Sequence, residues 1–163
     1  MTRRASTTLL LAGLALVLSA CGASPAAPPA VAGLPLSHLL EGTEARAAIN
    51  RLHGKAIPAR DAFVAHYEQD GAVAMLYVTR AWITPLAWWQ FSRMVKGIEA
   101  GGANREGRFT HLKAREQDGL TLYSALGVGQ VHYFYRSDAT IVWLAADPHV
   151  ARAAMAETVR VVR

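Results

Sequence analysis

The sequence predicts a single α+β domain of two layers, in which an antiparallel sheet of about six strands carries about three helices on one face. Three observations predict this class. Hydrophobic residues make up 52% and charged residues 18% of the 163 residues, which is enough apolar surface for one sizeable core. Asp-Gly pairs separate runs that alternate between apolar and polar residues, as they do between hairpin strands. Two strand-like runs end at a capping residue followed by proline, Thr84-Pro85 and Asp147-Pro148, which predicts a helix after each of them.

The individual elements follow from local patterns along the chain. Apolar residues at helical spacing predict three helices, the first ending at Gly54 and the others beginning at the proline pairs, over residues 44–53, 84–101 and 148–162. Alternating runs bounded by turn residues predict six strands, over 62–68, 72–81, 107–115, 120–126, 130–135 and 140–145. Hairpin turns are expected at Asp70-Gly71 and Asp118-Gly119.

The amino terminus has the pattern of an export signal. Arg3 and Arg4 precede an apolar run over residues 9–18, which is shorter than the roughly 20 residues that a membrane-spanning helix needs. Leu18-Ser19-Ala20-Cys21 then resembles the lipobox of bacterial lipoproteins. The resemblance implies that residues 1–20 are a signal peptide that is cleaved, and that Cys21 becomes the first residue and carries acyl chains. Two or three acyl chains hold a protein stably on a membrane.

Other interpretations of this terminus remain open. The protein could be secreted with an unmodified Cys21, and the arginine pair could belong to a twin-arginine signal, although the hydrophobic residues expected after such a pair are missing at residues 5–7. Gly22 follows the cysteine in place of the aspartate that retains lipoproteins in the inner membrane of enteric bacteria, which favours the outer membrane.

A spacer is expected after the cysteine. Residues 21–37 contain four prolines and no charge, a composition typical of a semi-rigid linker. The globular domain is therefore predicted to cover residues 38–163, tethered to the cell envelope by its lipid and lying in the periplasm.

The charge pattern excludes nucleic acid as the expected partner. The formal net charge is +5, but Arg3 and Arg4 belong to the predicted signal peptide and the remaining basic residues are scattered. The single cysteine excludes an intrachain disulfide and a zinc site built from cysteines. Neither a metal nor a cofactor is expected.

No motif of an enzyme is present. The sequence lacks a G-x-S-x-G nucleophile elbow and an H-E-x-x-H zinc motif, and Gly127-Val128-Gly129 is expected to be a turn between strands. One enzymatic alternative is a metal-dependent hydrolase that uses His66, Glu68 and His132, since the first two share one face of a strand.

The aromatic residues offer a second alternative. Tyr133 and Tyr135 share one face of a strand, opposite His132 and Phe134. A pocket that binds a small apolar ligand in the periplasm is predicted from four residues, namely Tyr67, Tyr133, Tyr135 and Trp143.

The helix after Pro85 carries the residues expected to make contacts. At 100° per residue, its buried arc is predicted to comprise Ala87, Trp88, Phe91, Met94, Val95 and Ile98. Trp89 falls on the opposite side with Arg93 and Lys96, where tryptophan and arginine one turn apart can stack as a cation–π pair. Such residues are enriched where proteins bind partners or lipid headgroups. The sequence thus predicts a non-enzymatic, membrane-anchored envelope lipoprotein that contacts a surface or an envelope protein partner through Trp89, Arg93 and Lys96.

Overall fold

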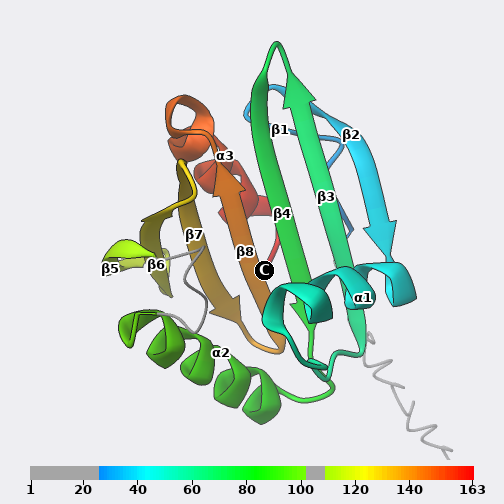
Figure 1. The fold of residues 1–163 in the computed structure, drawn as a ribbon, viewed down its shortest axis with the longest axis vertical. Helices are drawn as coiled ribbons and strands as arrows, with labels where there is room; N and C mark the ends of the chain where they lie inside the picture. The colour runs from blue at the N-terminus through cyan, green and yellow to red at the C-terminus, as the bar shows by residue number, and fades with distance from the viewer. Residues whose placement is uncertain (1–25, 102–108) are drawn as a thin grey trace, which may run out of the picture.

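The computed structural model describes residues 26–101 and 109–163, which form three helices and one sheet (Figure 1). The helices are α1 (Gly42–His53), α2 (Thr84–Glu99) and α3 (Pro148–Val161). The strands are β1 (Ala30–Val31), β2 (Leu34–Glu41), β3 (Asp61–Gln69), β4 (Ala72–Arg80), β5 (Thr110–Gln117), β6 (Leu120–Gly127), β7 (Gln130–Ser137) and β8 (Thr140–Ala146). Residues 107 and 108, where the strand before β6 was expected to begin, lie outside the described residues.

The sheet confirms the predicted α+β class but is wider than expected. Its eight strands follow the order β1-β2-β3-β4-β8-β7-β6-β5, and every neighbouring pair is antiparallel. The prediction of about six strands was wrong because β1 and β2 lie in the proline-rich segment. Pro35 lies opposite Ala30 of the edge strand β1, and β2 pairs with β3 only from Leu36 onward, so the missing N–H of Pro35 removes no hydrogen bond to β3.

The predicted boundary of the domain at residue 37 also has to be corrected. Val31 and Leu34 are buried in the core, and the hydroxyl of Tyr67 donates a hydrogen bond to the carbonyl of Pro28 at 3.0 Å. Residues 28–37 are therefore part of the folded domain rather than a linker, because their apolar side chains pack against the sheet.

The helices cover both faces of the sheet, not one face as predicted. Leu76 of β4 and Leu144 of β8 point to the side of α3, where they share a buried cluster with Met155. Their strand neighbours Tyr77 and Trp143 point to the other side, which α1 and α2 cover. Alternate residues of a strand point to opposite faces, and both sets are apolar in β4 and β8. These central strands therefore need a helix layer on each side.

Local turn chemistry sets the ends of several elements. Asp70 and Gly71 have φ angles of 52° and 79°, and they form the tight β3–β4 turn that the Asp-Gly pair predicted. Gly54 ends α1 with a φ of 63°, and its N–H donates to the carbonyl of Arg51. Gly127-Val128-Gly129 connects β6 and β7, as expected.

Candidate interaction surface

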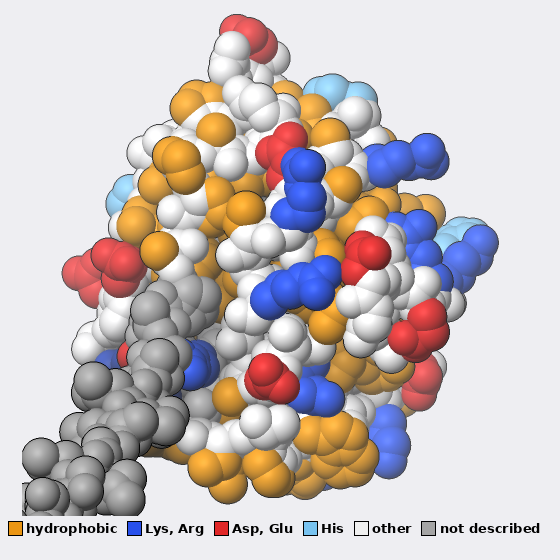
Figure 2. Space-filling view, turned by 180° about the vertical axis from the view of Figure 1, so that it is seen from behind, with side chains coloured by type: hydrophobic (Ala, Val, Ile, Leu, Met, Phe, Trp, Pro, Cys, Tyr) orange, Lys and Arg blue, Asp and Glu red, His pale blue; other side chains and the backbone are white. Residues whose placement is uncertain are grey.

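Large apolar side chains are exposed around the start of α2. Trp82, Ile83, Trp88 and Trp89 are 67%, 59%, 60% and 51% exposed, and we call these four residues the tryptophan surface. They account for four of the eight large hydrophobic residues that are exposed in the described part of the chain. Figure 2 shows hydrophobic side chains gathered at the lower end of the molecule, the end at which α2 lies in Figure 1.

The junction between β4 and α2 is held in a way that leaves these side chains outside the core. Ala81 is buried, and its N–H donates to the carbonyl of Ala139 at 2.8 Å, which fixes the chain as it leaves the sheet. The carbonyl of Ile83 then accepts hydrogen bonds from the N–H groups of Leu86 and Ala87 in the first turn of α2. The backbone of this junction is thus ordered, while Trp82 and Ile83 point into solvent.

Trp88 does not lie in the buried face of α2, contrary to the prediction. The helix packs on the sheet through Ala87, Phe91, Val95 and Ile98. Trp88 is turned by about 100° from Ala87. The helix lies close to the sheet at the small Ala87 side chain, and the neighbouring tryptophan therefore stays at the margin, where it is exposed.

The predicted contact residues of α2 lie as expected on its exposed side. The guanidinium carbon of Arg93 lies 5.4 Å from the ring centroid of Trp89, which confirms the predicted cation–π pair. Lys96 is exposed in the last turn of the helix. Sequence reasoning found Trp89 by its position on the helix but missed Trp82, Ile83 and Trp88. The available signal was the Trp82-Ile83 pair, which is large and apolar yet lies between a strand and a helix.

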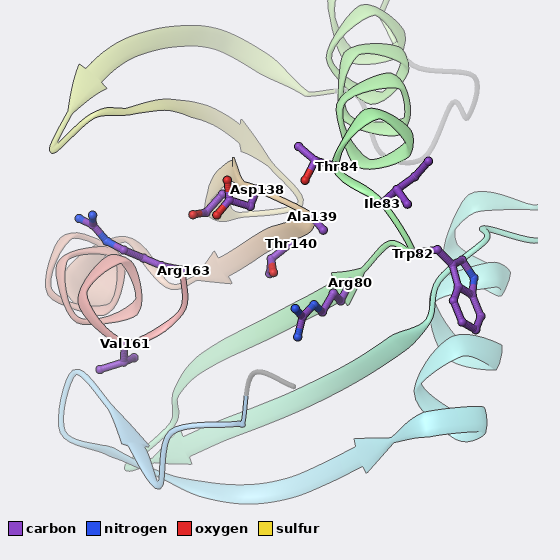
Figure 3. A pocket seen from close by; sticks show the side chains of 10 residues that line it. Arg80, Trp82, Ile83, Thr84, Asp138, Ala139, Thr140, Val161 and Arg163 are labelled. Atoms are coloured by element: carbon purple, nitrogen blue, oxygen red, sulfur yellow. The ribbon is translucent and has the colours of Figure 1, made fainter. Parts of the chain in front are cut away.

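A shallow hollow of about 600 Å³ lies beside the tryptophan surface (Figure 3). It lies at the ends of β4, β7 and α3, and Trp82 and Val161 flank it on opposite sides. Its charged residues are Arg80, Arg163 and the exposed Asp138. The complete lining is Arg80, Trp82, Ile83, Thr84, Ser137, Asp138, Ala139, Thr140, Val161 and Arg163. The hollow therefore joins apolar and positively charged groups at one end of the domain.

The structure does not bring the four predicted pocket residues together. Tyr67, Tyr133 and Tyr135 point to the face that α3 covers, whereas Trp143 points to the opposite face. Tyr67 and Tyr135 are fully buried core residues. Burial raises the pKa of Tyr67 to about 12, and burial also raises the pKa of Tyr135. The hydroxyl of Tyr135 donates to the carbonyl of Val162 at 2.6 Å, so it is engaged in holding the end of α3.

On the other face, aromatic rings from three strands form a stack. Phe134 lies between Trp143, with ring centroids 4.6 Å apart, and Tyr123, with centroids 5.4 Å apart, and both pairs are nearly parallel. His132 is buried beside this stack. Its Nδ1 accepts a hydrogen bond from the Trp143 indole N–H at 3.1 Å, and its Nε2 lies 2.9 Å from the carbonyl of Gly127. Burial lowers the pKa of His132, and this arrangement suits the neutral imidazole with a proton on Nε2.

The residues of the predicted hydrolase site are separated. His66 and Glu68 lie together on β3, with 3.6 Å between Nε2 and Oε2, as their spacing predicted. His132 lies on β7, three strands away across β4 and β8, which places it about 14 Å from His66. Within residues 26–101 and 109–163, no group of three histidine, cysteine, aspartate or glutamate side chains could hold a metal ion.

The predicted signal peptide and Cys21 lie outside the described residues. The first described residues, 26–29, run along the face of the sheet that α3 covers, where Ala27 packs against the core. Among the described residues, none of the helices is both long enough and apolar enough to cross a membrane.

The fold and this surface define a class of protein: an antiparallel α+β domain with a helix layer on each face of its sheet and an exposed tryptophan surface at one end. Comparison of the chain with protein-family models, with curated proteins and with solved structures finds no match.

Proposed function

We propose that this protein is a lipid-anchored, non-enzymatic protein of the bacterial envelope that acts through surface contact, with the tryptophan surface as its contact element. The observation that carries the proposal is the exposure of three tryptophans and one isoleucine within residues 82–89. Soluble domains seldom expose large apolar side chains in groups, and where they do, the group commonly marks an interaction site. Tryptophan and arginine are also the residues that contribute most to binding at interfaces.

The rest of the domain supports this assignment, because the aromatic residues of its core have structural roles. Tyr67, Phe134 and Tyr135 are fully buried, and the hydroxyls of both tyrosines donate hydrogen bonds to backbone carbonyls. The tryptophan surface has no such role in the core. Binding of a small apolar ligand has no comparable support, since the four predicted pocket residues lie on two faces of the sheet.

The contact is tested by photo-cross-linking in intact bacterial cells. A photoreactive phenylalanine analogue replaces Trp88 in one variant and Leu126, an exposed residue of β6, in the matched control. We expect adducts from position 88 but not from position 126. Equal labelling at both positions, or none at position 88, would contradict the proposed contact element.

The lipid anchor is tested separately by intact mass spectrometry of the protein purified from membranes. A mass equal to residues 21–163 plus two or three acyl chains is the expected result. A mass without acyl chains would show that the lipid-anchored part of the proposal is wrong.

A further inference from the structure

We infer that the tryptophan surface docks on a lipid bilayer that contains anionic phospholipids, the same membrane that holds the acyl chains of Cys21. This inference rests on the proposed function, because it names the surface that the contact element meets. Three independent features lead to it: the length of the tether, the kind of apolar residue exposed, and the distribution of charge.

The tether between the predicted anchor and the folded domain is short. Only residues 22–25 separate Cys21 from Ala26, the first described residue. A chain spans at most about 3.6 Å per residue, so Cys21 lies within about 18 Å of Ala26. A lipidated Cys21 would therefore hold the domain against the membrane, rather than at the end of a long linker as the predicted spacer of residues 21–37 implied.

The tryptophan surface lies within reach of the same membrane. Pro28 contacts Tyr67, which pairs with Ala74 in β4. From Ala74 the strand runs to Arg80, about 20 Å, and the tryptophan surface begins two residues later. The anchor and the tryptophan surface can therefore meet one bilayer at the same time.

The exposed residues are of the type that favours the membrane interface. Tryptophan is enriched at the level of lipid headgroups, since its ring is largely apolar and its N–H remains able to form hydrogen bonds. Trp82, Trp88 and Trp89 are all more than half exposed. They are therefore available to a lipid surface without any rearrangement of the core.

Charge favours the same orientation. Arg93 and Lys96 lie on the exposed side of α2, and Arg80 and Arg163 line the adjacent hollow, whose only acidic lining residue is Asp138. The tip of the β3–β4 hairpin, at the opposite end of the sheet, carries Glu68 and Asp70, and Figure 2 shows acidic side chains there. Basic groups are attracted to anionic lipid and acidic groups are repelled, so the domain is oriented with its tryptophan surface toward the bilayer.

The test uses the lipidated protein reconstituted in vesicles and measures fluorescence quenching by brominated acyl chains. Three of the four tryptophans belong to the tryptophan surface, and the fourth, Trp143, lies in the aromatic stack. We expect brominated lipid to remove more than half of the tryptophan fluorescence in vesicles that contain phosphatidylglycerol. Quenching should be weaker in vesicles of phosphatidylcholine alone.

Two variants and one control separate docking from tethering. Trp82→Ser combined with Trp88→Ser should abolish most of the quenching of Trp89. Arg93→Gln removes one charge and should lower the equilibrium between docked and undocked domain about fivefold on anionic vesicles. Val128→Ser changes an exposed apolar residue in the β6–β7 turn, at the other end of the sheet, and should leave quenching unchanged.

The outcomes distinguish this inference from the proposed function. If the protein is recovered with the vesicles in a flotation assay but brominated lipid does not quench its tryptophan fluorescence, docking on lipid is refuted. The proposed lipid anchor is not affected by that result. Cross-linking of position 88 to a protein would then identify a protein partner instead. If the purified protein carries no acyl chain, the anchor is refuted, and quenching after addition to preformed anionic vesicles still decides whether the surface docks.

Discussion

Replacing Phe134 with alanine should destabilise the domain by about 3–5 kcal/mol, whereas replacing Trp88 with alanine should lower the free energy of unfolding by less than about 1 kcal/mol. Phe134 has no exposed surface, and it contacts Trp143, Tyr123 and Phe91 at centroid distances of 4.6, 5.4 and 6.2 Å. Its loss leaves a cavity beneath α2. Trp88 is 60% exposed, and alanine has the higher helix propensity, which offsets part of the lost contact.

Urea denaturation of both variants, followed by far-ultraviolet circular dichroism, measures the difference. Circular dichroism is preferable to fluorescence here because one variant loses a tryptophan. Phe134→Ala should unfold at a much lower urea concentration than the parent protein, whereas the urea midpoint of Trp88→Ala should stay close to that of the parent. A loss of several kcal/mol in Trp88→Ala would refute the reasoning, because it would make the exposed tryptophan a structural residue and remove its availability for contact.

Three further predictions concern polar side chains that are buried or half-buried. Tyr135→Phe should cost about 1–2 kcal/mol, because the carbonyl of Val162 loses its buried donor, and an unchanged urea midpoint would contradict that hydrogen bond. Burial lowers the pKa of His132 in the folded state, so the unfolded state binds more protons below pH 6.5. The contribution of His132 to the free energy of unfolding is therefore fully present above about pH 6.5. It falls as the pH drops toward the lower pKa of the folded state, by at most about 1.4 kcal/mol per pH unit. In urea titrations between pH 5 and pH 7, the free energy of unfolding of His132→Gln should depend less on pH than that of the parent protein. If both proteins show the same pH dependence, other groups cause it. Glu157→Ala removes the carboxylate that accepts the N–H of Ala32 at 2.7 Å, so that amide should exchange with deuterium faster, and unchanged protection would show that the contact does not hold the β1–β2 turn.

Features that depend on a few neighbouring residues could be predicted from the sequence. The Asp70-Gly71 turn, the end of α1 at Gly54 and the start of α2 at Thr84-Pro85 all lie where their residue types indicate. In each case a local backbone preference coincides with the final structure. The six strands predicted from alternating runs were confirmed for the same reason.

Features that depend on packing between distant segments could not be predicted in this way. Residues 30–37 have the composition of a linker, and they form strands only because the edge of β3 and the core beneath it are available to them. The strand order places β4 beside β8, which no local pattern specifies. The second helix layer did leave a signal, since neighbouring residues of opposite faces are both large and apolar, Leu76 and Tyr77 in β4 and Trp143 and Leu144 in β8.

The candidate site was predicted in part. Helical geometry placed Trp89 and Arg93 together on the outside of α2, and the structure confirms their contact. The same geometry put Trp88 in the buried arc, because a helical projection does not show where the sheet beneath the helix ends. The role of Cys21 stays a prediction, since that residue lies outside the described part of the chain.

The strand order also determines when the two central strands of the sheet can pair during folding. Its two central strands, β4 and β8, are separated in sequence by the whole of α2, β5, β6 and β7, and β8 comes last in sequence among the strands of this sheet. Until β8 has emerged, β4 keeps an unpaired edge, and the core between the two strands stays open. Pairing across such long sequence separations makes folding slow. A chain with this strand order that crosses a membrane unfolded, amino end first, completes its core only after β8 has crossed.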